Sequence, residues 1–198
     1  ALQTESQATE WPTVFLFVVT YAVWVAGTTV LWSFSPTLAI LLTALAIRQY
    51  SSLTHEVLPG HPPRNQTLSE LLVFPGLTIY VPYLRFKDLH LKHHYDPALT
   101  DPYDDPESNY LDPKVWARLP GPTKLLLRFN NTLAGRMLVG PAVSSWALLK
   151  GDGKAILQGD RRVALGWALH LPGLVLVWLW LAHVGAMPVW AYLVAAYL

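Results

Sequence analysis

Two long stretches without a charged side chain constrain the fold of this chain most strongly. Residues 11–47 and 163–198 contain no Asp, Glu, Lys or Arg. A helix crosses the hydrocarbon core of a bilayer with about 20 apolar residues, so each stretch is long enough for two crossings joined by a tight turn. The sequence therefore predicts an all-α integral membrane protein with two transmembrane helical hairpins, in agreement with its 53% hydrophobic and 14% charged residues.

The membrane spans are expected at about residues 11–32, 36–57, 163–181 and 187–198, after a polar tail over residues 1–10. Trp11 and Trp32 stand at the two ends of the first span, where tryptophan anchors a helix in the membrane interface. The last span has only about ten residues, fewer than a crossing needs. We therefore expect the sequence to be a fragment, or the ordered part, of a longer chain.

The segment between the hairpins, about residues 58–162, is expected to be cytosolic and helical. All 14 Lys and Arg residues lie between Arg48 and Arg162, and basic residues near membrane ends mark the cytoplasmic side. Within this segment, residues 71–84 are apolar but too short to cross, which predicts an interfacial or re-entrant element. Residues 122–149 are typical of an amphipathic helix broken near Gly140, and GDGK at residues 151–154 is typical of a turn.

Composition also excludes several functions. The chain has no cysteine, which excludes disulfides, zinc fingers, iron–sulfur ligation and thiol catalysis. A net charge of +1 without a basic cluster gives no indication of nucleic acid binding.

Five of the seven histidines fall in two clusters, HEVLPGH and HLKHH. In the second cluster, the spacing i, i+3, i+4 places three imidazoles on one side of a helix. In the first, the Pro59-Gly60 break lets the second histidine turn back toward the same metal as the first. Neutral imidazole binds Zn, Cu, Fe and Ni, so the ligand type does not select the metal. We predict metal binding by His55, His61, His90, His93 and His94.

Three acidic residues flank these clusters. Glu56, Asp88 and Asp96 are candidates for hydrogen bonds that orient an imidazole, while pairing of either aspartate with Arg85 or Lys92 is the open alternative. The remaining histidines are expected to be structural: His170 buried and hydrogen-bonded to a neighbouring helix, and His183 at the membrane interface.

The order of these features resembles the integral-membrane fatty acid desaturase family. The shared layout is a hydrophobic hairpin, an H-(x)n-H box, an apolar interfacial stretch, an HxxHH box, a cytosolic segment and a second hairpin. RFKDLHLKHHYDPALTDPYDDPES is particularly similar to bacterial members, and the resemblance extends over nearly the whole chain from about residue 12.

The resemblance implies a non-haem di-iron oxidoreductase that uses O₂ to introduce a double bond into a fatty acyl chain. It implies that His55 and His61 are iron ligands of the first histidine box, and that His90, His93 and His94 are those of the second. It further implies a lipid or acyl substrate and electrons from a separate ferredoxin-, rubredoxin- or cytochrome-type protein. The expected location is a membrane, most simply a bacterial inner membrane, with the boxes on the cytoplasmic side.

Two features depart from the family pattern. A third histidine box, expected after the fourth span, is absent because the sequence stops at Leu198, so we expect this chain alone to lack a complete di-iron site. Related sequences also often carry a histidine where Pro59 stands, as in HExxHGH, and this puts the binding mode of the first box in question.

Two alternatives stay open. A hydroxylase or ketolase of the same architecture would act on alkanes, sterols or carotenoids. A non-redox metal-binding membrane protein, such as a zinc transporter or a scaffold, belongs to another class. The position of the histidines disfavours a transporter, whose sites lie near the bilayer midplane on spanning helices.

Overall fold

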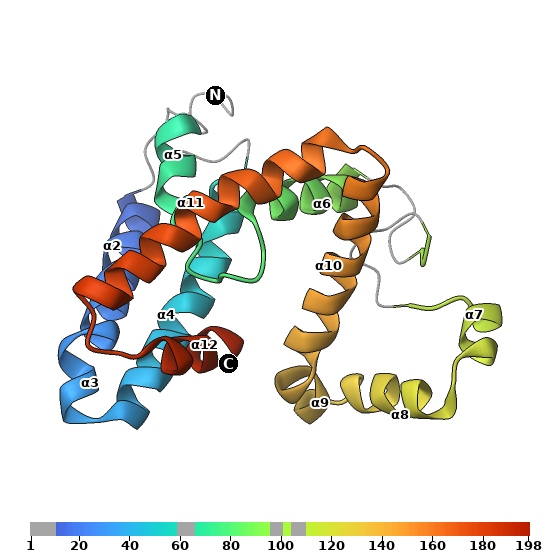
Figure 1. Ribbon diagram of the computed structural model, residues 1–198, viewed down its shortest axis with the longest axis horizontal. Coiled ribbons are helices and arrows are strands. Elements are labelled where there is room, and N and C mark those ends of the chain that lie inside the picture. Colours follow the sequence, from blue (N-terminus) through green and yellow to red (C-terminus); the bar gives the residue numbers. More distant parts are fainter. Residues whose placement is uncertain (1–10, 59–65, 96–100, 104–109) are drawn as a thin grey trace. The chain divides into compact units, whose positions relative to one another are not determined.

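The computed structural model describes residues 11–58, 66–95, 101–103 and 110–198 (Figure 1). Throughout these residues the regular structure is helical, with no strand, which confirms the predicted all-α class. The helices are α2 (Trp11–Thr28), α3 (Val30–Phe34), α4 (Pro36–Glu56), α5 (Gln66–Val73), α6 (Tyr83–Tyr95), α7 (Pro113–Arg118), α8 (Gly121–Asn130), α9 (Leu133–Leu138), α10 (Gly140–Leu157), α11 (Arg161–His183) and α12 (Val189–Tyr197).

Two of these helical stretches are long and apolar enough to cross a membrane. They are Trp11–Phe34, which comprises α2 and α3, and Arg161–His183, which is α11. Helices also occupy the second and fourth predicted spans, as α4 and α12. That the four helices cross a bilayer as two hairpins stays a prediction.

The chain forms two compact units. The first contains residues 1–83 and 165–198, and the second contains residues 84–164.

In the first unit, α2 packs along α4 through small side chains. A Cβ atom placed on Gly27 would lie 2.3 Å from the Thr43 hydroxyl oxygen and 3.4 Å from the carbonyl oxygen of Ala39. The two backbones therefore approach closely because position 27 has no side chain. Such small-residue contacts are the usual way that membrane helices pack, since apolar burial does not drive association inside lipid.

The end of α2 is tied to the turn between α11 and α12. The carbonyl oxygen of Thr28 accepts hydrogen bonds from the backbone N–H groups of Ala186 and Met187, at 2.9 and 3.1 Å. The Thr28 hydroxyl accepts another from the indole N–H of Trp180 at 3.0 Å. These bonds hold α2 beside α11, and α12 in turn packs against α4.

The apolar stretch predicted at residues 71–84 ends α5 and continues as a non-helical segment before α6. Side chains from four helices hydrogen-bond to backbone carbonyls of this stretch. The donors are Tyr21 to Leu72, Tyr50 to Val73, Tyr192 to Leu77 and His170 to Ile79. The last carbonyls of a helix and the carbonyls of non-helical backbone both need partners from elsewhere. Tyr21 and Tyr50 supply them at the end of α5, and Tyr192 and His170 supply them in the non-helical segment.

His170 has the structural role expected from the sequence, although its partner is this segment and not a neighbouring helix. Its side chain is buried, and its Nε2 donates to the carbonyl oxygen of Ile79 at 3.0 Å. Ile79 has a φ of 53°, a conformation that is uncommon for a β-branched residue. The hydrogen bond holds the backbone at that point.

The second unit contains helices α7 to α10 and nearly all of α6. α9 turns tightly onto the end of α8, where the Thr132 hydroxyl donates to Phe129 and accepts from the N–H of Gly135. A Cβ atom at Gly135 would lie only 1.8 Å from the carbonyl oxygen of Phe129, so this corner requires glycine.

The turn predicted for GDGK at residues 151–154 is wrong, because these residues lie inside α10. Each glycine lowers helix stability by roughly 1 kcal/mol relative to alanine. Two glycines within four residues therefore indicated a turn. Asp152 lies between these two glycines and is buried in an ion pair.

Candidate metal site

The second histidine cluster lies on α6, a helix of 13 residues. The ring centroids of His90, His93 and His94 are separated by 6.2 Å (90 to 93), 4.5 Å (90 to 94) and 5.7 Å (93 to 94). The Phe86 ring stacks on His90 one helical turn earlier, with a centroid distance of 5.2 Å. The spacing therefore does what the sequence predicts: it gathers the three imidazoles on one side of a helix.

Two of these imidazoles present the same nitrogen to one another. The Nε2 atoms of His90 and His94 are 2.9 Å apart. When ligand nitrogens bind a metal at about 2.1 Å, two neighbouring ligands at a right angle lie about 3 Å apart. Here one Nε2 donates a hydrogen bond to the other, and the same spacing matches the edge of a metal coordination sphere.

The first cluster contributes His55, at the exposed end of α4. Its Nδ1 lies 3.2 Å from the carbonyl oxygens of Ser51 and Ser52. A carbonyl oxygen only accepts, so the neutral imidazole carries its hydrogen on Nδ1 and its lone pair on Nε2. Such a backbone bond fixes the tautomer of metal-binding histidines in proteins, which makes Nε2 of His55 suited to a metal.

The described residues do not include all of the predicted metal ligands. His61, Pro59 and Asp96 lie outside the residues that the structure describes. Over the described ranges, no three His, Asp or Glu side chains form a group able to hold a metal. The assignment of all five histidines as metal ligands therefore stays a prediction.

Asp88, a candidate for orienting an imidazole, instead pairs with arginines. Arg162 donates to the Asp88 carboxylate from Nε at 2.7 Å, and Nη1 of Arg85 lies 3.8 Å from the same carboxylate. The hydrogen bonds from Arg162, assisted by the charges of both arginines, lower the pKa of Asp88. The structure thus favours the alternative in which Asp88 pairs with Arg85. Glu56 is the last residue of α4.

Arg85 also forms the ion pair that attaches α6 to α10. Its Nε and Nη2 atoms donate to the two carboxylate oxygens of Asp152, each at 2.8 Å. The side chains are 11% and 6% exposed, and the hydrogen bonds to Asp152 raise the pKa of Arg85. This two-pronged geometry fixes direction as well as distance.

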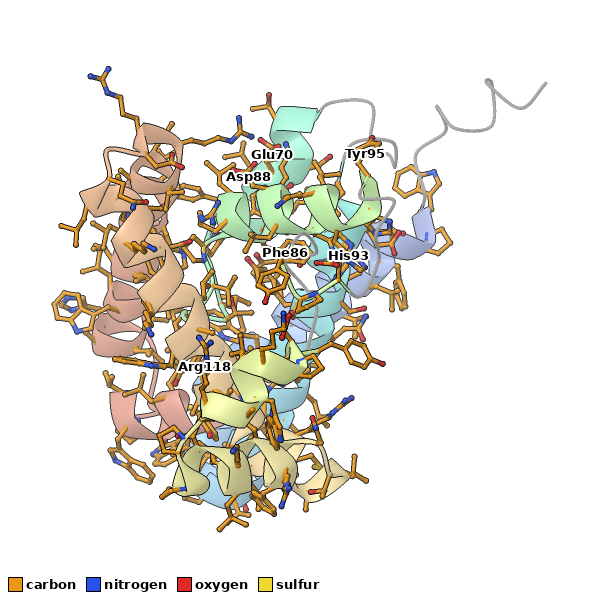
Figure 2. The ribbon with its side chains drawn as sticks, turned by 90° about the vertical axis from the view of Figure 1, so that its right-hand side faces the viewer. Glu70, Phe86, Asp88, His93, Tyr95 and Arg118 are labelled. Atoms are coloured by element: carbon orange, nitrogen blue, oxygen red, sulfur yellow. The ribbon has the colours of Figure 1, made fainter. Side chains whose placement is uncertain are left out.

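The two sides of α6 therefore have different roles. Figure 2 shows Phe86 and His93 on one side of the helix and Asp88 on the other. Ion pairs on the second side attach the helix to its neighbours, and the imidazoles are left on the first.

One of three comparisons with known proteins finds a match. The family model for fatty acid desaturases matches residues 31–198. The chain belongs to the fatty acid desaturase family. No curated protein and no solved structure matches it.

Membership of the fatty acid desaturase family suggests an oxidoreductase with a lipid substrate and a place in or at a membrane. The two apolar helices are consistent with a membrane protein. The match includes both histidine clusters of this desaturase-family chain and the residues that attach α6.

Sequence reasoning missed Asp152 and Arg162 as partners of the histidine helix. Only the i, i+3 spacing of Arg85 and Asp88 gave a local signal, since such pairs are neighbours on a helix. Asp152 lies within GDGK, which the sequence analysis interpreted as a turn, so it was not considered as a partner of α6.

Proposed function

We propose that the protein is a membrane-bound, O₂-dependent di-iron oxidoreductase that introduces a double bond into a fatty acyl chain. The observation that carries the proposal is the 2.9 Å approach of the His90 and His94 Nε2 atoms in a chain of the fatty acid desaturase family. The proposed iron ligands are His55, His61, His90, His93 and His94.

Bound iron would supply the reductive activation of O₂ that removes two hydrogens from neighbouring carbons. The overall reaction takes a –CH₂–CH₂– unit, O₂, two electrons and two protons to an alkene and two water molecules. The residues of this chain hold the ligands in place: the Arg85–Asp152 pair fixes α6, and the carbonyl oxygens of Ser51 and Ser52 fix the tautomer of His55.

The proposed reaction needs an electron donor, which we expect to be a separate protein. The chain shows no flavin, haem or iron–sulfur motif, and its lack of cysteine excludes thiolate-bound clusters. We propose a ferredoxin-, rubredoxin- or cytochrome-type donor that reaches the histidines from the cytoplasmic side of a bacterial inner membrane. The concentration of Lys and Arg between residues 48 and 162 supports this orientation.

Product analysis under ¹⁸O₂ tests the proposal. The full-length protein, with whatever follows Leu198, is loaded with Fe(II) in lipid nanodiscs, supplied with a reduced ferredoxin and its reductase, and given phospholipid with saturated acyl chains. We expect acyl chains two hydrogens lighter without ¹⁸O. An alcohol or ketone carrying ¹⁸O, with no alkene, would instead identify a hydroxylase or ketolase.

Metal analysis distinguishes the proposed oxidoreductase from a non-redox metal-binding protein. The same preparation is examined for iron and zinc, with His93→Ala as the matched variant. Iron bound by the wild type and lost from the variant supports the proposal. Zinc bound in place of iron, with no O₂ consumption, identifies a non-redox metal-binding protein.

A further inference from the structure

A basic segment covers α7, α8, α9 and the first part of α10. Residues 113–151 contain no Asp or Glu. Their charged side chains are all positive: Lys114, Arg118, Lys124, Arg128, Arg136 and Lys150. The chain as a whole has a net charge of only +1, so this basic segment concentrates positive charge in one part of the second unit.

The helix α8, within the basic segment, exposes its apolar side. Leu125, Leu126 and Phe129 are 70%, 43% and 40% exposed. At 100° per residue these side chains share one side of the helix, while Thr123 and Leu127, on the other side, are partly buried. An amphipathic helix of a soluble domain places its apolar side inward, and α8 does the reverse.

The next helix adds to this surface. Leu133 and Met137 are 79% and 65% exposed, and their i, i+4 spacing places them on the same side of α9. The glycine corner at Gly135 holds α9 against the end of α8. Figure 1 shows α9 beside α8 at the foot of α10. The apolar side chains are therefore fixed on two short helices that adjoin each other.

Basic side chains lie among these apolar ones. Arg128 and Arg136 are exposed. The Arg128 guanidinium lies 5.7 Å from the centre of the Trp116 ring, and Lys124 Nζ donates to the carbonyl oxygen of Ala117 at 3.0 Å. A surface of this kind matches the interface of a bilayer, where acyl chains take up apolar side chains and anionic headgroups pair with Lys and Arg.

We propose that α8 and α9 lie in the interface of an anionic bilayer. Leu125, Phe129, Leu133 and Met137 insert at the boundary between headgroups and acyl chains, and the flanking arginines pair with lipid phosphates. This contact goes beyond the proposed function, because it attaches the second unit to lipid independently of iron, O₂ and substrate.

Single cysteines test the proposal, since the chain has none of its own. Leu125→Cys and Leu133→Cys each carry a spin label in the full chain, and Gln158→Cys, at the exposed end of α10, is the matched control. Nanodiscs contain either phosphatidylcholine alone or equal parts of phosphatidylcholine and phosphatidylglycerol. Collisions with O₂ report lipid exposure of the label, and collisions with a water-soluble nickel chelate report water exposure. Circular dichroism checks that each variant retains its helices.

In anionic nanodiscs we expect labels at positions 125 and 133 to be exposed to O₂ and protected from nickel, with the control label open to nickel. Each basic residue near an anionic surface contributes about a fivefold change in membrane partition. Replacing Arg118, Arg128 and Arg136 by glutamine is therefore expected to raise nickel exposure at position 125 at least severalfold, as is omission of phosphatidylglycerol.

Two results would overturn the proposal. One is equal nickel exposure at positions 125, 133 and 158 in anionic nanodiscs. The other is protection that appears only with two copies per disc or after addition of an acidic redox protein, which would assign the surface to a protein partner.

Discussion

At the scale of single residues, the 13 residues of α6 carry the candidate metal ligands on one side and the ion pairs that attach the helix on the other. The imidazoles of His90, His93 and His94 share one side, whereas Arg85 and Asp88 form ion pairs on the other. A substitution on one side is therefore expected to affect metal binding, and a substitution on the other to affect stability.

His93→Ala is expected to abolish iron loading while leaving the helix content unchanged, because the side chain lies with the other imidazoles and outside the buried core. Elemental analysis and circular dichroism measure the two effects. His183→Ala, at the exposed end of α11, is the matched control and is expected to bind iron like the wild type. Full iron loading of His93→Ala would contradict the ligand assignment.

Asp152→Ala is expected to lower the free energy of unfolding by about 3 kcal/mol, because it leaves the Arg85 guanidinium buried without its main partner. Denaturant unfolding in detergent measures the change. Lys154→Ala, two residues later on an exposed position, is expected to change the same free energy by less than about 0.5 kcal/mol. Equal effects of the two substitutions would show that the ion pair does not stabilise the second unit.

Two tyrosines provide a matched test of buried hydroxyl groups. The Tyr192 hydroxyl donates to Leu77 and accepts from the Trp24 indole N–H, so Tyr192→Phe is expected to cost about 1–3 kcal/mol. The buried Tyr83 hydroxyl has no hydrogen-bond partner in the described structure, so Tyr83→Phe is expected to be neutral or stabilising. Thermal unfolding of the two variants compares them, and a larger loss from Tyr83→Phe would contradict this interpretation.

At the scale of helices, glycine has opposite effects at two places in the second unit. Gly135→Ala is expected to cost about 1–3 kcal/mol, because its Cβ would meet the Phe129 carbonyl at 1.8 Å. Gly153→Ala places a Cβ in open space within α10, and is expected to stabilise by up to about 1 kcal/mol. Denaturant unfolding gives both values, and stabilisation by both substitutions would show that the α8–α9 corner tolerates a side chain.

Helix positions were predictable because the signals were local. The uncharged stretches, Pro36 and the HLKHH spacing each act within a few turns of helix. GDGK was misread because the interaction that keeps it helical joins Asp152 to Arg85, 67 residues earlier in the chain. Sequence periodicity carries no information about such a partner.

At the scale of the whole molecule, the sequence predicts the orientation in the membrane from its charge distribution. Ser33→Cys, between the first two spans, and Gln158→Cys, between α10 and α11, are both exposed. In intact bacteria we expect a membrane-impermeant thiol reagent that has crossed the outer membrane to label the first variant and spare the second. Permeabilised cells, in which both are labelled, serve as the control. Labelling of position 158 in intact cells would reverse the assigned sidedness.

The metal site was predictable only in part. The spacing in HLKHH predicted a shared side of one helix, because i, i+3 and i+4 are neighbours on any helix. No local pattern predicted that Ser51 and Ser52 would set the tautomer of His55, or that Arg162 would occupy Asp88. The first is a contact of particular atoms within α4, whereas the second joins residues 74 positions apart and depends on how the chain packs.

The segment just before α6 has a consequence for the order of events during synthesis. Its carbonyl at Leu77 is bound by Tyr192, and its carbonyl at Ile79 by His170. Both partners leave the ribosome about a hundred residues later, so the segment emerges long before these partners exist. We expect its final conformation to form only after α11 and α12 have been made, with its carbonyl groups hydrated until then.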